Sequence, residues 1–156
     1  MSDPAYQPTP LIPALARIYR PLDRFAWGAL RFAAGAWLVP HGAQKLFGWF
    51  GGRGLEATSA GFAKMGFEPG WLVGPLVGGT EFFGGILIAI GLLTRPAALA
   101  AMILLLVAAV EVHLAHGFFW GNRGYEYPLL WAVLCATITV RGGGPLSVDR
   151  ALGKEF

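Results

Sequence analysis

One apolar stretch, residues 71–93, limits what this chain can fold into more than any other part of the sequence. It reads WLVGPLVGGTEFFGGILIAIGLL and holds one ionisable residue, Glu81, near its middle. About 20 mostly apolar residues in a helix are enough to cross the hydrocarbon core of a bilayer. We therefore predict a transmembrane helix here. A carboxylate within such a helix is a candidate functional residue by default.

Glu81 shares one helix face with glycines. Gly74, Gly78, Glu81 and Gly85 follow one another at helical spacings, so they project from the same side. A stripe of small residues lets the backbone of a second helix approach closely within lipid. We therefore expect the carboxylate to face the interior of a helix bundle and not the lipid tails.

Composition places the whole chain in the membrane class. It has 156 residues, enough for one domain, and is 55% hydrophobic and 13% charged, with a mean hydropathy of +0.55. Soluble domains carry roughly 25% charged residues. A soluble all-helical core protein would need polar helix faces, which segments 71–93 and 97–110 lack.

The predicted fold is all-α: an antiparallel four-helix transmembrane bundle with a short interfacial helix between the first two spans. The domain covers residues 24–141, and its spans are expected at about 25–47, 71–93, 97–116 and 125–141. The short link 93–96 makes the second and third spans antiparallel neighbours. Within the first span, we expect Arg31 to extend its side chain to the lipid headgroups.

Tails flank this domain at both ends. Residues 1–23 form a Pro-rich N-terminal tail without the apolar run of a cleavable signal peptide, and a short interfacial helix is possible at 14–19. Residues 142–156 form a polar C-terminal tail. Four spans put both tails on one side, with the basic residues Arg17, Arg20, Arg24, Arg95, Arg141, Arg150 and Lys154. The other side holds Lys45, Arg53, Lys64 and Arg123, so this bias favours cytoplasmic termini in a bacterial inner membrane.

Threading the spans up and down gathers the remaining ionisable residues in the outer half of the bundle. The candidate polar pocket consists of His41, Lys45, Glu81, His113, His116, Tyr125 and Glu126. Each residue also has a purely structural explanation. Lys45 can contact the headgroups, and Glu81 can form an ion pair that only stabilises helix packing. We expect no catalytic residue among them.

Cofactor chemistry is limited by what the sequence lacks. His113 and His116 have the i, i+3 spacing of paired imidazoles, but a metal site would need a third ligand such as His41 or Glu126, so none is predicted. The single Cys135 lies in an apolar run and suits a small core residue. No haem, flavin, Fe–S or nucleotide motif is present, nor a basic aromatic face for nucleic acid. A quinone, whose carbonyl oxygens accept hydrogen bonds, would suit the pocket.

Several short motifs together resemble the DoxX family. They are HGAQKLFG at 41–48, Glu81 between Gly-Gly pairs, GLLTR at 91–95, GFF at 117–119, GYEYP at 124–128 and the final Ser-x-Asp-Arg at 147–150. The resemblance implies a small four-span bacterial inner-membrane protein associated with membrane oxidoreductase systems, including quinone-linked sulfur oxidation.

Three functions remain open at this stage. The first is an accessory or quinone-site subunit of a membrane oxidoreductase, with no independent activity and with a partner membrane protein or a second copy beside it. The second is a small carrier or binding protein for a proton, a metal ion or a small organic molecule. The third is a structural membrane subunit.

Overall fold

The computed structural model describes residues 11–155, and within that range the chain is helical, with no β-strand. The α-helices are α1 (Pro13–Phe47), α2 (Gly54–Lys64), α3 (Gly70–Gly79), α4 (Gly85–Ile90), α5 (Thr94–Val107), α6 (Glu126–Arg141) and α7 (Val148–Ala151). A π-helical turn, η2 (Thr80–Gly84), joins α3 to α4, and a second one, η3 (Ala108–His113), extends α5. The predicted all-α class is confirmed.

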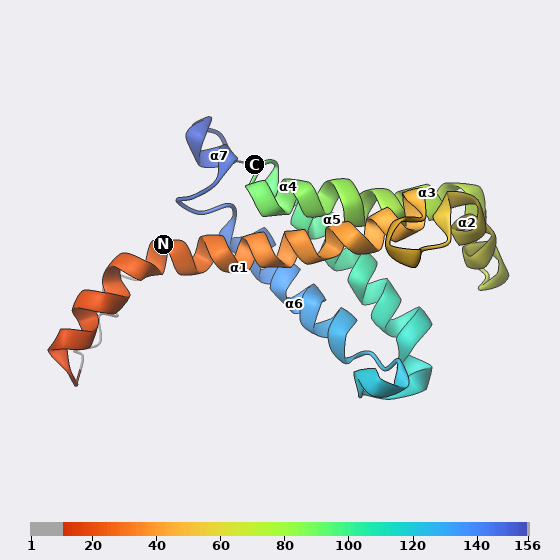
Figure 1. Cartoon of the computed structure of the whole chain (residues 1–156), viewed down its shortest axis with the longest axis horizontal. Helices are drawn as coiled ribbons and strands as arrows, with labels where there is room; N and C mark the ends of the chain where they lie inside the picture. The colour runs from red at the N-terminus through yellow and green to blue at the C-terminus, as the bar shows by residue number, and fades with distance from the viewer. Residues whose placement is uncertain (1–10, 156) are drawn as a thin grey trace.

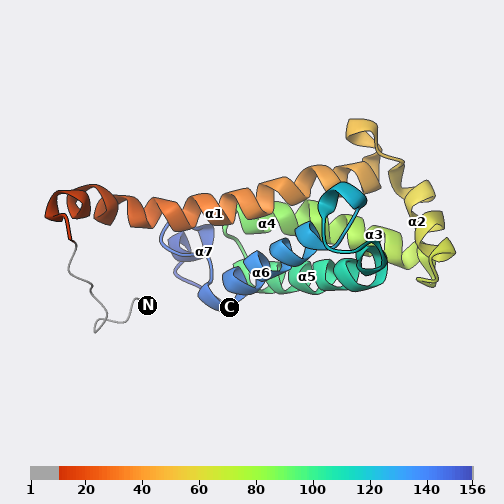
Figure 2. The same cartoon turned by 90° about the horizontal axis from the view of Figure 1, so that it is seen from below.

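The helices form two packed pairs. The continuous rod of α3, η2 and α4 runs beside α1, and α5 packs against α6 as an antiparallel hairpin (Figure 1). The hairpin contacts the first pair along α4 and η2, and its far end diverges from α3 (Figure 1). Figure 2, turned by 90°, shows α2 lying across the opposite end of the α3 rod.

Within residues 11–155, two helices are long and apolar enough to cross a membrane: Gly70–Ile90 and Thr94–His116. They correspond to the predicted second and third spans. The first expected span lies in a helix that carries Arg31, His41 and Lys45, which lower its hydropathy. The fourth, α6, has 16 residues and is short for a span.

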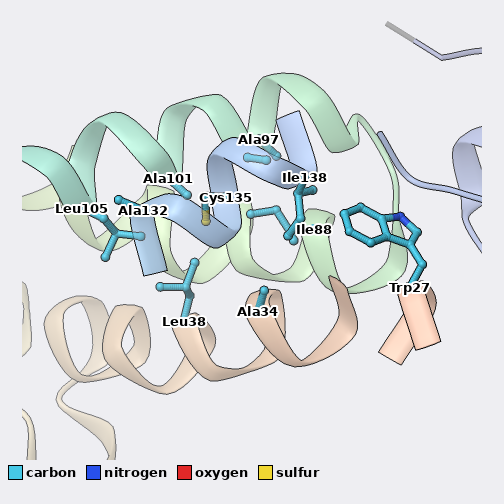
Figure 3. Packing of buried hydrophobic residues seen from close by; sticks show 11 residues of the cluster. Trp27, Ala34, Leu38, Ile88, Ala97, Ala101, Leu105, Ala132, Cys135 and Ile138 are labelled. Atoms are coloured by element: carbon cyan, nitrogen blue, oxygen red, sulfur yellow. The ribbon is translucent and has the colours of Figure 1, made fainter. Parts of the chain in front are cut away.

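The core consists mainly of small side chains where the two helix pairs meet (Figure 3). Trp27, Ala34 and Leu38 of α1 face Ile88 of α4. The hairpin contributes Ala97, Ala98, Ala101 and Leu105 from α5 and Ala132, Cys135 and Ile138 from α6. Cys135 is fully buried here, which confirms its predicted role as a small core residue.

The glycine face predicted around Glu81 is confirmed, because Gly74, Gly78, Glu81 and Gly85 are all buried. Its partner is a second set of glycines on α1. A Cβ atom built on Gly35 would strike the backbone of Gly85 and Ala89. One on Gly42 would strike the backbone of Gly78 and Phe82, so α1 and the α3–α4 rod touch backbone to backbone.

We expect Gly35→Ala and Gly42→Ala to lower the free energy of unfolding by about 1–3 kcal/mol or more, because backbone atoms cannot move aside as a side chain can. Thermal unfolding of the purified chain in detergent measures this. Gly61→Ala in α2 is the matched control: nothing lies within 4 Å of its built Cβ. Alanine has the better helix propensity, so this variant should be as stable as the parent or slightly more so. Equal losses in all three variants would contradict the packing described.

Arg31 does not extend to headgroups as expected from the sequence; that prediction is wrong. The residue is 2% exposed, and its guanidinium donates to four backbone carbonyls. Two of these, from Ile88 and Ala89, belong to the last turn of α4, where carbonyls lack partners within the helix. The other two, from Gly143 and Leu146, belong to the chain after α6 (N–O distances 3.0 and 2.6 Å). Burying a charge is costly unless it is hydrogen-bonded in this way.

Asp149 fastens the same C-terminal segment (residues 142–155) to the start of α5. Its carboxylate accepts hydrogen bonds from the backbone amides of Leu93 (2.8 Å) and Thr94 (3.0 Å) and from the Thr94 hydroxyl (2.7 Å). These amides are unpaired donors at a helix N-terminus, where a negative charge is favourable. Arg31 therefore binds the end of α4, and Asp149 caps the beginning of α5.

The stability of this attachment should depend on pH. Burial alone would raise the pKa of Asp149, but the hydrogen bonds from Thr94 and Leu93 and the charge of Arg31 hold it below its ordinary value of 3.8. The folded state then binds fewer protons than the unfolded state near that pH. The stabilisation is complete above the ordinary pKa and is lost as the pH falls through the lower folded value.

We expect Asp149→Asn to lower the free energy of unfolding at neutral pH by about 2 kcal/mol, because the asparagine NH₂ would face the donors of Thr94. It should also flatten the fall in stability below about pH 4. Detergent unfolding curves over a pH series measure both effects. Glu56→Gln, at an exposed acid in α2, is the control and should leave the fall in stability at acidic pH unchanged.

Candidate functional site

The central feature of the candidate site is an ion pair between Lys45 of α1 and Glu81 of η2. The Lys45 Nζ atom lies 2.8 Å from Oε1 and 2.6 Å from Oε2 of Glu81, so the amine contacts both carboxylate oxygens. The Glu81 side chain is 10% exposed and that of Lys45 is 27% exposed. The carboxylate is therefore enclosed between the helices, while the amine is reachable from the surface.

The local helix geometry explains how the two groups meet. Lys45 lies in the last turn of α1, where a positive charge is favourable, and the helix ends at Gly48 with a left-handed conformation (φ 72°). Glu81 lies in the π-helical turn Thr80–Gly84, a geometry frequent at functional sites. Gly78 lets α1 approach, because a Cβ there would press on the side chains of Leu46 and Lys45. His41 lies one helical turn before Lys45 and is exposed.

Aromatic rings lie next to the ion pair along the chain. Phe47 packs edge-on against Phe82, with ring centroids 5.1 Å apart, and the Trp49 ring lies 5.0 Å from that of Phe47. Phe82 in turn contacts Phe83. Phe47, Trp49 and Phe83 are exposed, so this part of the α1–α3 pair carries both exposed rings and a partly exposed amine. A flat, partly polar ligand could use both kinds of contact.

The other predicted pocket residues make contacts of their own at the far end of the α5–α6 hairpin. Nδ1 of His113 lies 2.6 Å from the Arg123 carbonyl oxygen, and its ring lies beside Trp120. Glu126 accepts a hydrogen bond from the Trp120 amide (3.0 Å). Tyr125 packs edge-on against Phe118, and His116 is exposed.

The predicted residues thus fall into two groups. Lys45 and Glu81 are in contact, and His41 lies one helical turn from Lys45. The structure places His113, His116, Tyr125 and Glu126 at the far end of the hairpin, on the two sides of the loop that joins α5 to α6. Among the residues described, no hydrogen bond or ion pair joins the two groups, and this end of the hairpin diverges from α3 (Figure 1). Within residues 11–155, no three His, Cys, Asp or Glu side chains lie close enough together to share a metal ion.

Sequence reasoning missed the polar contacts at the opposite end. The sequence predicts a headgroup contact for Arg31 and places Asp149 within a polar tail, yet both are buried and fix the C-terminal segment. A signal for this existed, since the Ser-x-Asp-Arg motif is typical of a helix N-terminus: Ser147 caps α7 by accepting from the Arg150 amide.

Comparisons with known proteins decide the family. A sequence model of the DoxX family matches residues 26–114, more than half of the chain and including both members of the ion pair. The chain belongs to the DoxX family. Membrane association of DoxX proteins agrees with the two apolar helices of this member.

A curated relative of this DoxX protein is known from Haemophilus influenzae. It is described as an uncharacterized protein and is 33% identical over 78 residues, which make up 50% of this chain and 52% of the relative. The chain thus spans about half the length of the curated relative it matches. No solved structure matches.

In this DoxX protein, removing Lys45 alone should lower the free energy of unfolding more than removing both members of the ion pair. We expect Lys45→Met to destabilise the fold by about 3–5 kcal/mol, because it leaves the Glu81 carboxylate buried without a partner. Glu81→Gln should cost less, since the more exposed Lys45 can turn towards water or headgroups. Lys45→Met combined with Glu81→Gln should recover part of the loss, because no lone buried charge remains. Lys64→Met, at an exposed amine on α2, should change stability by less than about 0.5 kcal/mol. Additive effects in this cycle would show that the two groups do not interact.

Proposed function

We propose that this DoxX protein is a four-span inner-membrane subunit of an oxidoreductase system, and that its Lys45–Glu81 pair binds the headgroup of a quinone. The observation that supports this most is the contrast within the pair: a buried carboxylate holds an amine whose side chain remains 27% exposed. The carboxylate orients the amine, and the amine keeps hydrogen-bond donors for a ligand carbonyl. The electrons that reduce the quinone would come from a partner protein, since the sequence carries no redox cofactor motif.

The topology in this proposal uses all four long helices. The α1 stretch from residue 25 onward and α6 would join the two clearly apolar helices as spans one and four. The start of α1, the α4–α5 turn and the end of α6 lie at one end of the molecule (Figure 1). This end carries the larger share of arginines, which favours its placement on the cytoplasmic side. Lys45 and Glu81 would then lie toward the outer face.

Aromatic rings support a quinone over a simple ion. A quinone headgroup is flat, so it can pack against rings such as Phe47 and Phe82 while one of its carbonyls accepts a hydrogen bond. Its isoprenoid tail would remain in lipid.

The test is quinone binding by the full chain purified in lipid nanodiscs, measured by quenching of tryptophan fluorescence with a short-chain ubiquinone. We expect Lys45→Gln to weaken binding about tenfold or more, the value of a charge-assisted hydrogen bond. Lys64→Gln should bind like the parent. Thermal unfolding of each variant shows which losses are due to misfolding, and the Lys45→Gln/Glu81→Gln variant, which leaves no lone buried charge, should show the same loss of binding.

A second arm tests the partner. Cross-linking in native membranes followed by mass spectrometry should recover an oxidoreductase subunit with the parent chain. A chain that binds no quinone and cross-links to no other membrane protein would contradict the proposal.

A carrier function is the second candidate, and the π-helical position of Glu81 favours it. An acid and an amine 2.6 Å apart in the membrane can exchange a proton, and a π-helical turn can change its hydrogen bonding during such an exchange. Proton uptake into liposomes that is lost in Glu81→Gln would favour this function over the quinone site.

A further inference from the structure

The first twelve residues of α1 form a surface that nothing in the described chain covers. Figures 1 and 2 show this part of the helix projecting past the ends of α4, α5 and α6. Its large apolar side chains are open, with Ile18 55% and Leu22 51% exposed. The helix α1 has 35 residues, about 52 Å at 1.5 Å each, whereas the hydrocarbon core of a bilayer is about 30 Å thick. About 15 residues of α1 therefore exceed the length of a span. This is close to the 12 residues of α1, Pro13 to Arg24, that precede residue 25.

The exposed residues are sorted into two stripes. One stripe is apolar and contains Leu15, Ile18 and Leu22. The other is basic and contains Arg17, Arg20 and Arg24. At about 100° per residue the centres of the stripes are roughly 150° apart, so they lie on nearly opposite faces. An apolar face opposed by arginines is the pattern of a helix that lies in the membrane interface.

The helix also changes direction where this surface begins. In Figure 1 the start of α1 leaves the line that the rest of the helix follows along α4. Pro21 lies within this part of the helix, and an interior proline removes a backbone hydrogen bond and bends the helix. The bend allows the first turns to lie along a surface while the remainder crosses the membrane.

Charge indicates what kind of surface this is. The three arginines are opposed within the segment by Asp23 alone. Arg141 and Arg150, from the end of α6 and from α7, lie at the same end of the molecule (Figure 1), where Arg95 is paired with Glu155 at 3.6 Å. Basic groups on several elements at one end are complementary to a leaflet with anionic headgroups.

We propose that α1 from Pro13 to Arg24 is an interfacial anchor: its apolar stripe lies among the acyl chains next to the headgroups, and Arg17, Arg20 and Arg24 bind anionic lipid phosphates. The inference rests on the membrane insertion in the proposed function but not on any quinone site. The anchor fixes the depth and tilt of α1, and with them the depth of Lys45 at its other end.

The experiment uses the full chain in vesicles of phosphatidylcholine with or without phosphatidylglycerol. Ile18→Cys and Arg20→Cys, each combined with Cys135→Ala, carry the fluorophore NBD on the apolar and basic faces respectively. In vesicles with phosphatidylglycerol, we expect the probe at position 18 to shift to the blue and to be quenched by lipids with a spin label on the acyl chain. The probe at position 20 should remain in a wet environment.

The arginines are tested with the probe at position 18. Arg17→Gln with Arg24→Gln should reduce the ratio of membrane-bound to free helix about fivefold per arginine, and added salt should reduce it further. Arg53→Gln with Lys64→Gln, at exposed basic residues near the opposite end of the molecule, is the matched control and should have no effect.

Three outcomes would overturn the anchor. The first is a probe at position 18 that stays water-exposed in vesicles with phosphatidylglycerol. The second is binding that is equal in phosphatidylcholine alone and unchanged by loss of the arginines. The third is a probe that is shielded but not quenched by labelled lipid, which would indicate a protein partner. Loss of quinone binding with an intact anchor would reject only the proposed ligand, whereas a chain washed from vesicles by alkaline carbonate would reject both proposals.

Discussion

The structure depends above all on backbone contact between α1 and the rod formed by α3, η2 and α4. Gly35 and Gly42 on one side and Gly78 and Gly85 on the other remove the side chains that would hold the helices apart. Where lipid tails are as apolar as the helices, such close packing supplies most of the attraction between them. It also brings Lys45 within 2.6 Å of Glu81, so the same contact both holds the bundle together and builds the candidate site.

The charged side chains at the two ends of the molecule differ in what they bind and in how accessible they are. At one end Arg31 and Asp149 are buried and bind backbone groups, so they close the turns after α4 and after α6. At the other end Glu81 is bound by a single amine that remains partly open. A buried charge whose hydrogen bonds go to backbone groups and to a neighbouring hydroxyl has a structural role, whereas an accessible charge remains available to a ligand. This difference is why we assign the candidate site to Lys45 and Glu81.

The sequence was sufficient for the parts of the fold that follow from periodicity. The apolar lengths of 71–93 and 97–116, the glycine face around Glu81 and the buried Cys135 could all be predicted, because each is set by local spacing or by transfer from water. The role of Arg31 could not, since its partners lie 57 to 115 residues away in the chain. The divergence of the α5–α6 hairpin from α3 could not be predicted either, because it depends on how far the two helix pairs pack along each other. For the residues other than Lys45 and Glu81, the pocket predicted from the topology therefore remains a prediction.

The π-helical turn Thr80–Gly84 sets a condition on length as well as on residue type. Such a turn is wider than an α-helical turn and takes up one extra residue within its width. A deletion of one residue inside the turn would therefore narrow it to a regular α-helix and rotate α4 relative to α3 by much less than the ~100° that one residue adds to an α-helix. The same deletion within α3 or α4 would turn the residues beyond it, such as Gly74 or Ile88, away from α1. Relatives that keep both halves of this interface can therefore change length by one residue within the turn but not within either flanking helix.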